Sequence, residues 1–316
     1  MSNNKTAVVA LGGNAIGATG KEDIHRQFAN TRTAIDGILP LLREGYNIAI
    51  THGNGPQVGN ALLRVERTYP DLPALPLGVI VADTEGGIGY MIEQCLQNRL
   101  LQEKIARDVV TIVTQVVVDR DDPSIKDPSK PIGPYYQAGE VEGLKARGWT
   151  VKDDAGRGFR RFVPSPIPRA VVNKATIRDL VARGTVVITA GGGGVPVYAE
   201  PDGRYEGVDA VIDKDRASAV VARDIGAGTL LILTQVEKVA LNYKRPDQRD
   251  LDSLTLADAK RYLAQGHFAA GSMGPKVEAA IQFLEYGGER VIITSLDKAA
   301  QAVRGEAGTV IAGQAG

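Results

Sequence analysis

Three short apolar segments of this sequence each end in a glycine turn. The segments are 6–11, 47–51 and 185–189, and the turns after them are Gly12-Gly13-Asn14, Gly53-Asn54-Gly55 and 191–194. Uninterrupted runs of β-branched and apolar residues indicate strands buried on both faces, and helical spacing follows at 24–42 and near 62–65. This alternation predicts an α/β fold with a mainly parallel sheet. Right-handed crossovers would place the glycine turns at the carboxyl edge of that sheet.

The composition is that of an ordinary globular protein. The 316 residues can bury a sizeable core and suit one large domain or two lobes; 43% of them are apolar and 23% charged. Lys and Arg total 37, as do Asp and Glu, so the net charge of zero gives no support to nucleic acid or an anionic membrane as main partner.

The cysteine content and the apolar runs bear on location. No segment approaches 18 apolar residues and no signal peptide is recognisable, so we expect a cytoplasmic protein without a membrane span. The single cysteine, Cys95, fits a reducing compartment, and its place in a helical pattern favours the core over a nucleophile. Three separated histidines and one cysteine argue against a zinc site.

An apolar run at 109–118 predicts one long strand. The amino-acid composition of the chain changes after this run. Residues 119–168 hold many prolines and the only tryptophan, Trp149. This stretch is too long for a plain loop and too rich in proline for a regular βα unit. It predicts a small excursion at about 120–168 that protrudes over the sheet edge.

Lys214 lies between two aspartates where an apolar run, 210–212, gives way to a helical pattern that stops at Gly226. We expect short antiparallel strands before this helix. A helix N-terminus attracts anions, and a lysine held there by carboxylates can meet a phosphoryl group. The alternative is a solvated loop triplet in which one aspartate caps the helix.

Lys130 and Lys276 also stand beside a loop or a helix start. Three lysines and three glycine turns together predict a phosphate site, although neither the Walker pattern nor the dinucleotide fingerprint occurs. No general base stands out, because His52 in its glycine-rich turn is better interpreted as a loop-fixing residue than as a base. An acceptor that is already an anion, such as a carboxylate, would need no base.

Taken in order, these segments closely resemble the carbamate kinases of the amino acid kinase family. The resemblance covers nearly the whole chain and rests on residues 10–15, 51–59, 130–134, 154–158, 191–197, 211–215 and 266–280. It implies a three-layer α/β/α open sandwich with a mainly parallel central sheet and a small protruding subdomain. It also implies a homodimer and reversible transfer of a phosphoryl group between ATP and carbamate.

The resemblance further implies a carbamate- and phosphoryl-binding lobe over 1–185, with the subdomain inserted at about 120–168, and a nucleotide-binding lobe over 186–316. Mg²⁺ should arrive with ATP or ADP, without protein residues dedicated to the metal. The cellular direction in such enzymes is usually ATP synthesis from carbamoyl phosphate, in fermentative breakdown of arginine, agmatine or a purine.

Site residues follow from the same resemblance. The expected carbamate- and phosphoryl-binding residues are Gly12, Gly13, Asn14, Gly53, Asn54 and Gly55. Lys130 should close over the carbamate, and Lys214 and Lys276 should bind the transferring phosphate and the nucleotide phosphates, oriented by Asp215. The expected nucleotide side also includes Gly192, Gly193, Val236, Tyr243 and Met273.

The chain departs from the expected pattern at several positions. Ala10 stands where most of the wider family has a lysine, and Lys130 would supply the missing charge. Glu85 replaces an expected glutamine and should add a negative charge near the dimer or substrate side, and Gly274 replaces a larger apolar residue. Two alternatives stay open: a related kinase for another small carboxylate, such as an N-acyl amino acid, and a nucleotide-sensing protein that has lost the chemistry.

Overall fold

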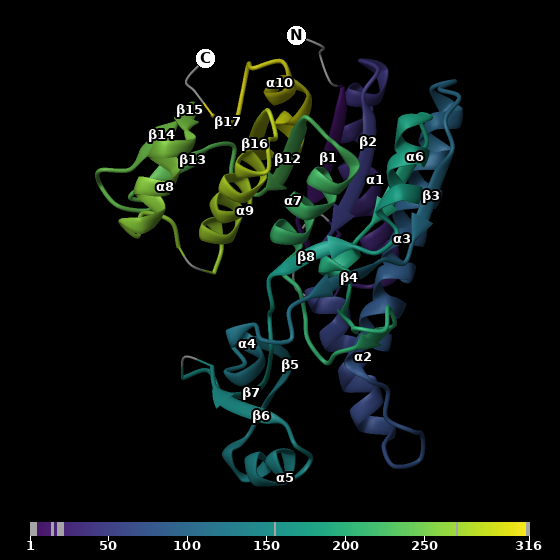
Figure 1. Cartoon of the computed structure of the whole chain (residues 1–316), viewed down its shortest axis with the longest axis vertical. Helices are drawn as coiled ribbons and strands as arrows, with labels where there is room; N and C mark the ends of the chain where they lie inside the picture. The colour runs from purple at the N-terminus through teal and green to yellow at the C-terminus, as the bar shows by residue number, and fades with distance from the viewer. Residues whose placement is uncertain (1–4, 14–15, 18–21, 155, 270, 314–316) are drawn as a thin grey trace.

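A large, mainly parallel sheet forms the centre of the molecule (Figure 1). The computed structural model describes residues 5–13, 16–17, 22–154, 156–269 and 271–313. In spatial order the strands of this sheet are β15 (Ser253–Thr255), β17 (Thr309–Ala312), β16 (Arg290–Ser295), β12 (Thr229–Thr234), β1 (Thr6–Leu11), β2 (Asn47–His52), β9 (Val186–Thr189) and β3 (Val109–Ile112). All neighbours pair in parallel except β16 and β17.

Helices cover both faces of this sheet. Along β1, Ala7, Val9 and Leu11 face one apolar core, whereas Val8 and Ala10 face the other, as the period of two in a strand requires. The first core contains α1 (Ile24–Arg43), α3 (Leu77–Gln102) and α10 (Ala299–Val303); the second contains α6 (Lys174–Ala182), α7 (Lys214–Ile225), α8 (Leu256–Ala264) and α9 (Met273–Glu285). The expected α/β/α layering is therefore confirmed, and Cys95 lies in the first core.

The carboxyl ends of β1, β2 and β9 lie next to one another at one edge of the sheet. Leu11 pairs with His52, and Ile50 with Ile188, so the glycine turns after these strands meet there. The third turn contains a short 3-10 helix, η3 (Gly191–Gly193), and leads into β10 (Val195–Ala199). The glycine turns therefore lie at the carboxyl edge of the sheet, as the sequence predicted.

A separate three-stranded sheet extends away from the large sheet, at the lower end of Figure 1. It consists of β5 (Lys130–Tyr136), β7 (Phe159–Val163) and β6 (Thr150–Asp153), and the same excursion contains α4 (Pro123–Lys126), η2 (Ala138–Glu140) and α5 (Val141–Ala146). Ile132 and Val163 pack on α2 (Gly55–Thr68) in a small apolar cluster of their own. The excursion therefore rests on the helix that starts at the second glycine turn.

Two expectations about strands are wrong. Residues 109–118 do not form one strand: β3 ends at Ile112, and β4 (Gln115–Val118) belongs to another sheet, with the order β11 (Tyr205–Gly207), β10, β4 and β8 (Pro168–Val171). The apolar run 210–212 is not a strand but an irregular segment that leads into α7. The remaining strands, β13 (Val239–Leu241) and β14 (Arg249–Leu251), form a hairpin, and η4 (Leu296–Lys298) precedes α10.

The large sheet draws strands from both expected lobes: β1, β2 and β3 precede residue 186 and its other strands follow. The boundary between lobes 1–185 and 186–316 stays a prediction. Within the described ranges, no helix combines the length and the apolar character needed to cross a membrane.

Candidate functional site

The first turn of α7 brings together a lysine and two carboxylates. The side chain of Asp213 caps the helix by accepting hydrogen bonds from the backbone N–H groups of Asp215 and Arg216, at 3.0 and 3.3 Å. The cap leaves Lys214 as the first helical residue, and its ammonium group pairs with one oxygen of Asp215. The cap expected in the alternative interpretation is therefore present, but the triplet is not a solvated loop, because Asp215 is buried and holds the lysine. Phosphoryl binding by Lys214 stays a prediction.

Asp215 connects two lysines from different helices. Its second oxygen accepts from Lys276 Nζ on α9 at 3.0 Å, and Lys276 Nζ also donates to the carbonyl of Ser272 at 3.4 Å. Only 3% of Asp215 is exposed, and burial alone would raise the pKa of its carboxyl group. The two adjacent ammonium groups outweigh burial and lower that pKa, so Asp215 is ionised and fixes both lysine side chains.

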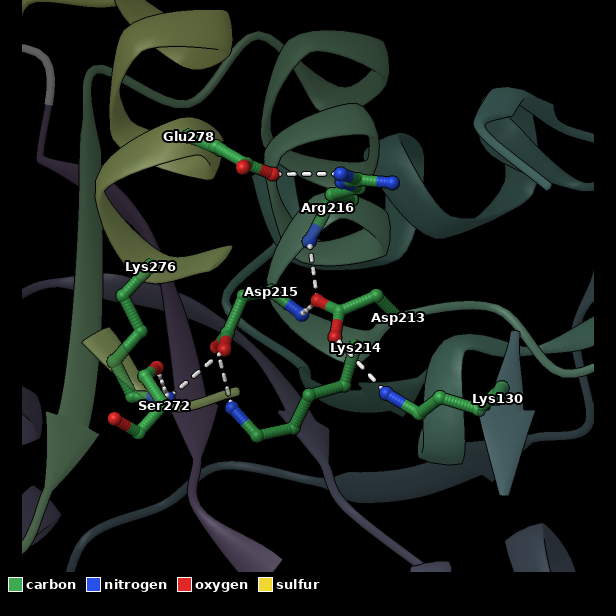
Figure 2. Close-up of polar contacts among 8 residues, drawn as sticks. All are labelled: Lys130, Asp213, Lys214, Asp215, Arg216, Ser272, Lys276 and Glu278. Carbon is green, nitrogen blue, oxygen red and sulfur yellow. Dashed lines mark hydrogen bonds and ion pairs between the residues drawn. The ribbon is translucent and has the colours of Figure 1, made fainter. Parts of the chain in front are cut away.

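The third lysine reaches the same place from the protruding sheet. Lys130 Nζ, at the start of β5, lies 3.5 Å from the free carboxylate oxygen of Asp213. Figure 2 shows Lys130, Lys214 and Lys276 converging on the two aspartates from three different segments. Three segments that together span more than 140 residues of the chain thus supply positive charge to one point.

Further contacts hold α7 in position. Arg216 pairs with Glu278 at 2.6 Å, which ties α7 to α9 two residues beyond each lysine (Figure 2). On its opposite side, Ser218 Oγ lies 2.6 Å from Thr51 Oγ in β2. Because both bonds involve the first turns of the helix, the orientation of Lys214 is set by the sheet and by α9.

The glycine turns form the wall of a cavity of about 330 Å³ beside these lysines. A side chain at Gly53 would be crowded, because an added Cβ would lie 3.0 Å from the backbone of Gly13 and 3.4 Å from the Lys214 side chain. Close contact between the first two turns therefore lets backbone N–H groups approach a ligand as closely as the lysines do.

The third turn packs directly against the second. Gly192 has a φ of +67°, and a Cβ there would lie 2.1 Å from Asn54 Nδ2. Asn54 Nδ2 in turn donates to Thr84 Oγ on α3, at 3.0 Å. The amide of Asn54 is therefore held between a glycine backbone and a helix, at the mouth of the cavity.

Most of the residues expected at the site line this cavity. They are Gly13, Gly53, Asn54, Gly55, Lys130, Gly192, Lys214, Asp215 and Lys276. Asn14 lies outside the described residues. Their roles in binding or catalysis stay predictions, but the structure brings the side chains and turns together.

Other expected residues do not line the cavity. An added Cβ at Gly12 would lie 3.1 Å from the carbonyl of Leu233, and one at Gly193 would lie 2.4 Å from that of Ile212, so both glycines serve close backbone packing. Val236 lies after β12, Tyr243 is 52% exposed after β13, and Met273 begins α9 against the second core. Their contact with a nucleotide stays a prediction.

Sequence reasoning missed the ion pair between Asp213 and Lys130 and the acceptor role of the Ser272 carbonyl. It also misplaced Glu85, which is not a charge near a dimer or substrate surface. Glu85 is 1% exposed on α3, and burial raises its pKa to about 8. The signal was available, because Glu85 follows Val81 by four residues and precedes Ile88 by three on the buried face of the helix.

His52 is fully buried at the end of β2 and does not line the cavity. Burial lowers its pKa to about 4, and Nδ1 lies 3.2 Å from the carbonyl of Gly53. The imidazole is therefore neutral at pH 7 and contacts its own turn, which supports the loop-fixing interpretation over that of a base.

The two carboxylates of the site leave little room for a divalent cation. Mg²⁺ binds oxygen ligands and usually keeps several waters and substrate phosphates. The carboxylates of Asp213 and Asp215 already contact lysines and backbone donors, and in the described ranges no group of three or more His, Cys, Asp or Glu could hold a metal ion. The arrangement fits an ion carried by a nucleotide better than one held by protein ligands.

Comparisons with known proteins agree over the whole chain. The model of the amino acid kinase family matches residues 5–295. A carbamate kinase from Thermococcus kodakarensis is 48% identical over 97% of this chain and 99% of its own length. A carbamate kinase-like protein from Escherichia coli is 46% identical over 98% of this chain and 99% of its own length.

Solved structures give the same result. Carbamate kinase from Giardia lamblia bound to AMP-PNP superposes with a TM-score of 0.93 at 41% identity, covering 99% of both chains. N-acetylglutamate synthase from Neisseria gonorrhoeae matches with a TM-score of 0.59 at 18% identity, over 98% of this chain and 62% of its own, which shows a shared fold alone.

Proposed function

The chain belongs to the amino acid kinase family, and from this premise we propose that it is a carbamate kinase, which transfers a phosphoryl group reversibly between ATP and carbamate. The relatives from Thermococcus kodakarensis and Giardia lamblia are named carbamate kinases, and the Giardia relative was solved with AMP-PNP. The observation that carries the proposal is the convergence of Lys130, Lys214 and Lys276 on one cavity edged by glycine turns.

The lysine pair on Asp215 suits the charge that moves in this reaction. A carbamate oxygen bonds to the γ-phosphorus while the bond from that phosphorus to the bridging oxygen breaks, and ADP leaves with the electron pair. Negative charge spreads over the transferring oxygens, and positive groups fixed in advance stabilise it without reorganising. Lys214 and Lys276 are fixed in this way by the ionised Asp215.

The acceptor side is positively charged. Lys130 enters from the protruding sheet and lines the cavity together with Lys214 of α7, Lys276 of α9, Asn54 and Gly55. The volume of about 330 Å³ can hold either acceptor, so the choice of carbamate over an N-acyl amino acid rests on the named relatives. Carbamate is already an anion and needs no base, which is consistent with a lining whose two aspartates both pair with lysines.

We propose that Mg²⁺ is bound with the nucleotide. When bound there it would neutralise charge on the phosphates. Asp215 would hold the two lysines rather than the ion, because both of its oxygens already pair with ammonium groups.

We also propose a homodimer in which α3 contributes to the interface. Val79, Tyr90 and Leu101 are 44%, 57% and 76% exposed, and their spacing of eleven residues places them on one stripe of the helix. Wild-type protein should sediment as a dimer, and Tyr90→Glu should shift it toward the monomer while Tyr90→Phe should not. A wild-type species of 33.5 kDa alone would exclude this interface.

We further propose a location for the enzyme, a direction for the reaction and a role for each lobe. We place the enzyme in the cytoplasm, making ATP from carbamoyl phosphate in the breakdown of arginine, agmatine or a purine. The N-terminal lobe would bind carbamate and the C-terminal lobe the nucleotide.

The test is ATP formation from ADP, Mg²⁺ and a panel of phosphoryl donors. Carbamoyl phosphate should support turnover at least 100-fold faster than acetyl phosphate or N-acetylglutamyl phosphate. Faster turnover with either of the other donors would assign a different carboxylate. No turnover with any donor, while ADP still binds, would favour the nucleotide-sensing alternative.

A further inference from the structure

Glu85 is a buried carboxyl group that the proposed reaction does not use directly. It lies in the middle of α3 and does not line the cavity. Its Oε1 accepts a hydrogen bond from the backbone N–H of Gly191 at 2.8 Å, and its Oε2 accepts from that of Thr114 at 3.2 Å. One side chain thus joins the third glycine turn to the break between β3 and β4.

The contacts of Glu85 lead directly to the cavity wall. Gly191 precedes Gly192, whose backbone packs against Asn54, and both Gly192 and Asn54 line the cavity. The neighbouring residue on α3, Thr84, accepts the hydrogen bond from Asn54 Nδ2. Two consecutive residues of one helix therefore hold the two sides of the contact between the second and third turns.

The third turn depends on such a support, because four of its five residues from 190 to 194 have a positive φ. These are Ala190, Gly192, Gly193 and Gly194, with Gly191 between the first two, and the φ of Ala190 is +47°. Hydrogen bonds inside the turn are few: Gly193 N donates to the carbonyl of Ala190 and Gly194 N to that of Gly191, both at 3.0 Å. The bond from Gly191 N to Glu85, together with that from Ala190 N to Thr114 Oγ, fixes the turn to the body of the protein.

We propose that Glu85 is a positioning residue for phosphoryl transfer: its carboxyl group, together with Thr84, sets the distance between Gly192 and Asn54 across the cavity wall. The proposal rests on the proposed function for its kinetic consequences, and on the hydrogen bonds alone for its structural ones. A misplacement of about 1 Å at such a wall can reduce turnover on the order of 100-fold.

The protonation state of Glu85 sets the charge behind the third glycine turn. The groups packed against Glu85 are Thr114, the uncharged glycine turn and His52 on β2, with Lys214 on α7 beyond His52. Burial holds the pKa of Glu85 near 8 and that of His52 near 4, so between pH 7 and 9 Glu85 changes charge and His52 does not. An ionised Glu85 places a negative charge directly behind a turn that binds an anion, which weakens binding of the transferring phosphoryl group.

The kinetic test compares Glu85→Gln and Glu85→Ala with the wild type. Glutamine keeps the shape and one acceptor but cannot accept from Thr114 N–H, so kcat should fall about 3- to 10-fold; alanine removes both bonds, and kcat should fall about 10- to 100-fold. The KM for ADP should stay within about twofold, because the lysines are untouched. The matched control is Glu206→Gln, the same chemical change at an exposed position on β11, which should leave kcat unchanged.

A pH profile separates positioning from a general loss of packing. Wild-type kcat should decline as the pH rises through about 8, and Glu85→Gln should lack this decline. Thr84→Val, which removes the acceptor for Asn54, should lower kcat without removing the decline, whereas Thr84→Ser should behave as wild type. The proposal would be overturned if Glu85→Gln had the kcat of the wild type and showed the same decline with pH.

Amide hydrogen exchange tests whether Glu85 holds the backbone at Gly191 and Thr114, without any assay of activity. Peptides spanning 187–194 and 110–116 should exchange faster in Glu85→Ala and Glu85→Gln than in the wild type or in Glu206→Gln. Unchanged exchange in both peptides would overturn the positioning role even if the enzyme is active. A wild type that turns over no donor would overturn the proposed function, and exchange would then decide the role of Glu85 independently.

Discussion

Asp215 shows how a buried charge can be stable and useful at the same time. An isolated carboxylate with so little exposure would be costly, but Lys214 and Lys276 each pair with one of its oxygens. The three groups carry a net positive charge, so the cluster attracts phosphate while its members hold one another in place. Removing any one member leaves the other two without a partner or without an orientation.

Lys130 differs from the α7 and α9 lysines because it is 45% exposed and enters from the protruding sheet. Lys130→Ala should therefore reduce kcat/KM for carbamoyl phosphate by at least 10-fold and change the dissociation constant of ADP by less than about threefold. Steady-state kinetics and calorimetric ADP titration measure the two quantities. Lys145→Ala, at an exposed position in the same excursion, is the control, since surface ion pairs contribute little.

Equal losses for both ligands in Lys130→Ala would make this lysine a nucleotide ligand instead.

The sequence predicted the role of a residue well where that role depends on the residue type and on its neighbours in the chain. Lys214 beside Asp215, and glycines after strands, fall into this class. It failed where the partner is distant in the chain: Glu85 binds Gly191, and Asp213 meets Lys130. Charge alone suggested a surface position for Glu85, whereas its spacing from Val81 and Ile88 indicated the buried face.

At the scale of elements, the N-terminus of α7 has two tasks that both depend on Asp213. One oxygen caps the helix, and the other contacts Lys130. Asp213→Asn keeps a cap residue but removes the charge, whereas Asp213→Ala removes both. The pair therefore separates helix stability from the electrostatics of the site.

Thermal unfolding of these two variants should differ. Asp213→Ala should lose about 1 kcal/mol of stability, and Asp213→Asn should stay within about 0.5 kcal/mol of the wild type, because asparagine is as good an N-cap as aspartate. Both should alter kcat/KM for carbamoyl phosphate, since both free Lys130 from its partner. Equal destabilisation by the two substitutions would show that the ion pair, rather than the cap, stabilises this region.

Element boundaries were predictable where hydrophobic period and caps agree, as in α7 and in α8 with its Thr255 cap. The run at 109–118 was not, because its apolar pattern continues across the break. Thr114 ends β3 by bonding elsewhere: its N–H donates to Glu85, and its Oγ lies 2.7 Å from that of Thr189. The sequence around 109–118 gives no indication of these distant partners, so only the structure shows that the strand is interrupted.

At the scale of the whole molecule, parallel pairing is what assembles the site. Strands β1, β2 and β9 end at the same edge, so three turns that are 38 or more residues apart in the chain share one wall. The protruding sheet rests on α2 and carries Lys130 to the opposite side of the cavity. The sequence predicted this edge, but the order of the strands and the path of the excursion depend on the full set of contacts.

Global stability should depend on pH through Glu85. Its pKa is about 8 in the folded protein and near 4.5 when unfolded, so the folded state binds the proton more tightly. The stabilisation is complete below about pH 4.5 and is lost as the pH rises toward 8. Relative to Glu85→Gln, the wild type should lose roughly 3 to 5 kcal/mol of unfolding free energy between pH 5 and 9.

Denaturant unfolding of both proteins across this pH range measures the difference. Parallel pH profiles for the wild type and Glu85→Gln would mean that Glu85 titrates near its ordinary value and that water reaches it.

The central claim is that the cluster of Lys214, Asp215 and Lys276 carries phosphoryl transfer from carbamoyl phosphate. The most direct measurement is kcat for ATP formation from carbamoyl phosphate and ADP by the wild type, Lys214→Ala and Lys276→Ala. Lys174→Ala is the matched control, because Lys174 is an exposed lysine that also begins a helix. The account predicts rapid turnover in the wild type and the control, and a loss of at least about 100-fold in both cluster variants with unchanged circular dichroism. Near-normal turnover in either folded cluster variant would contradict it.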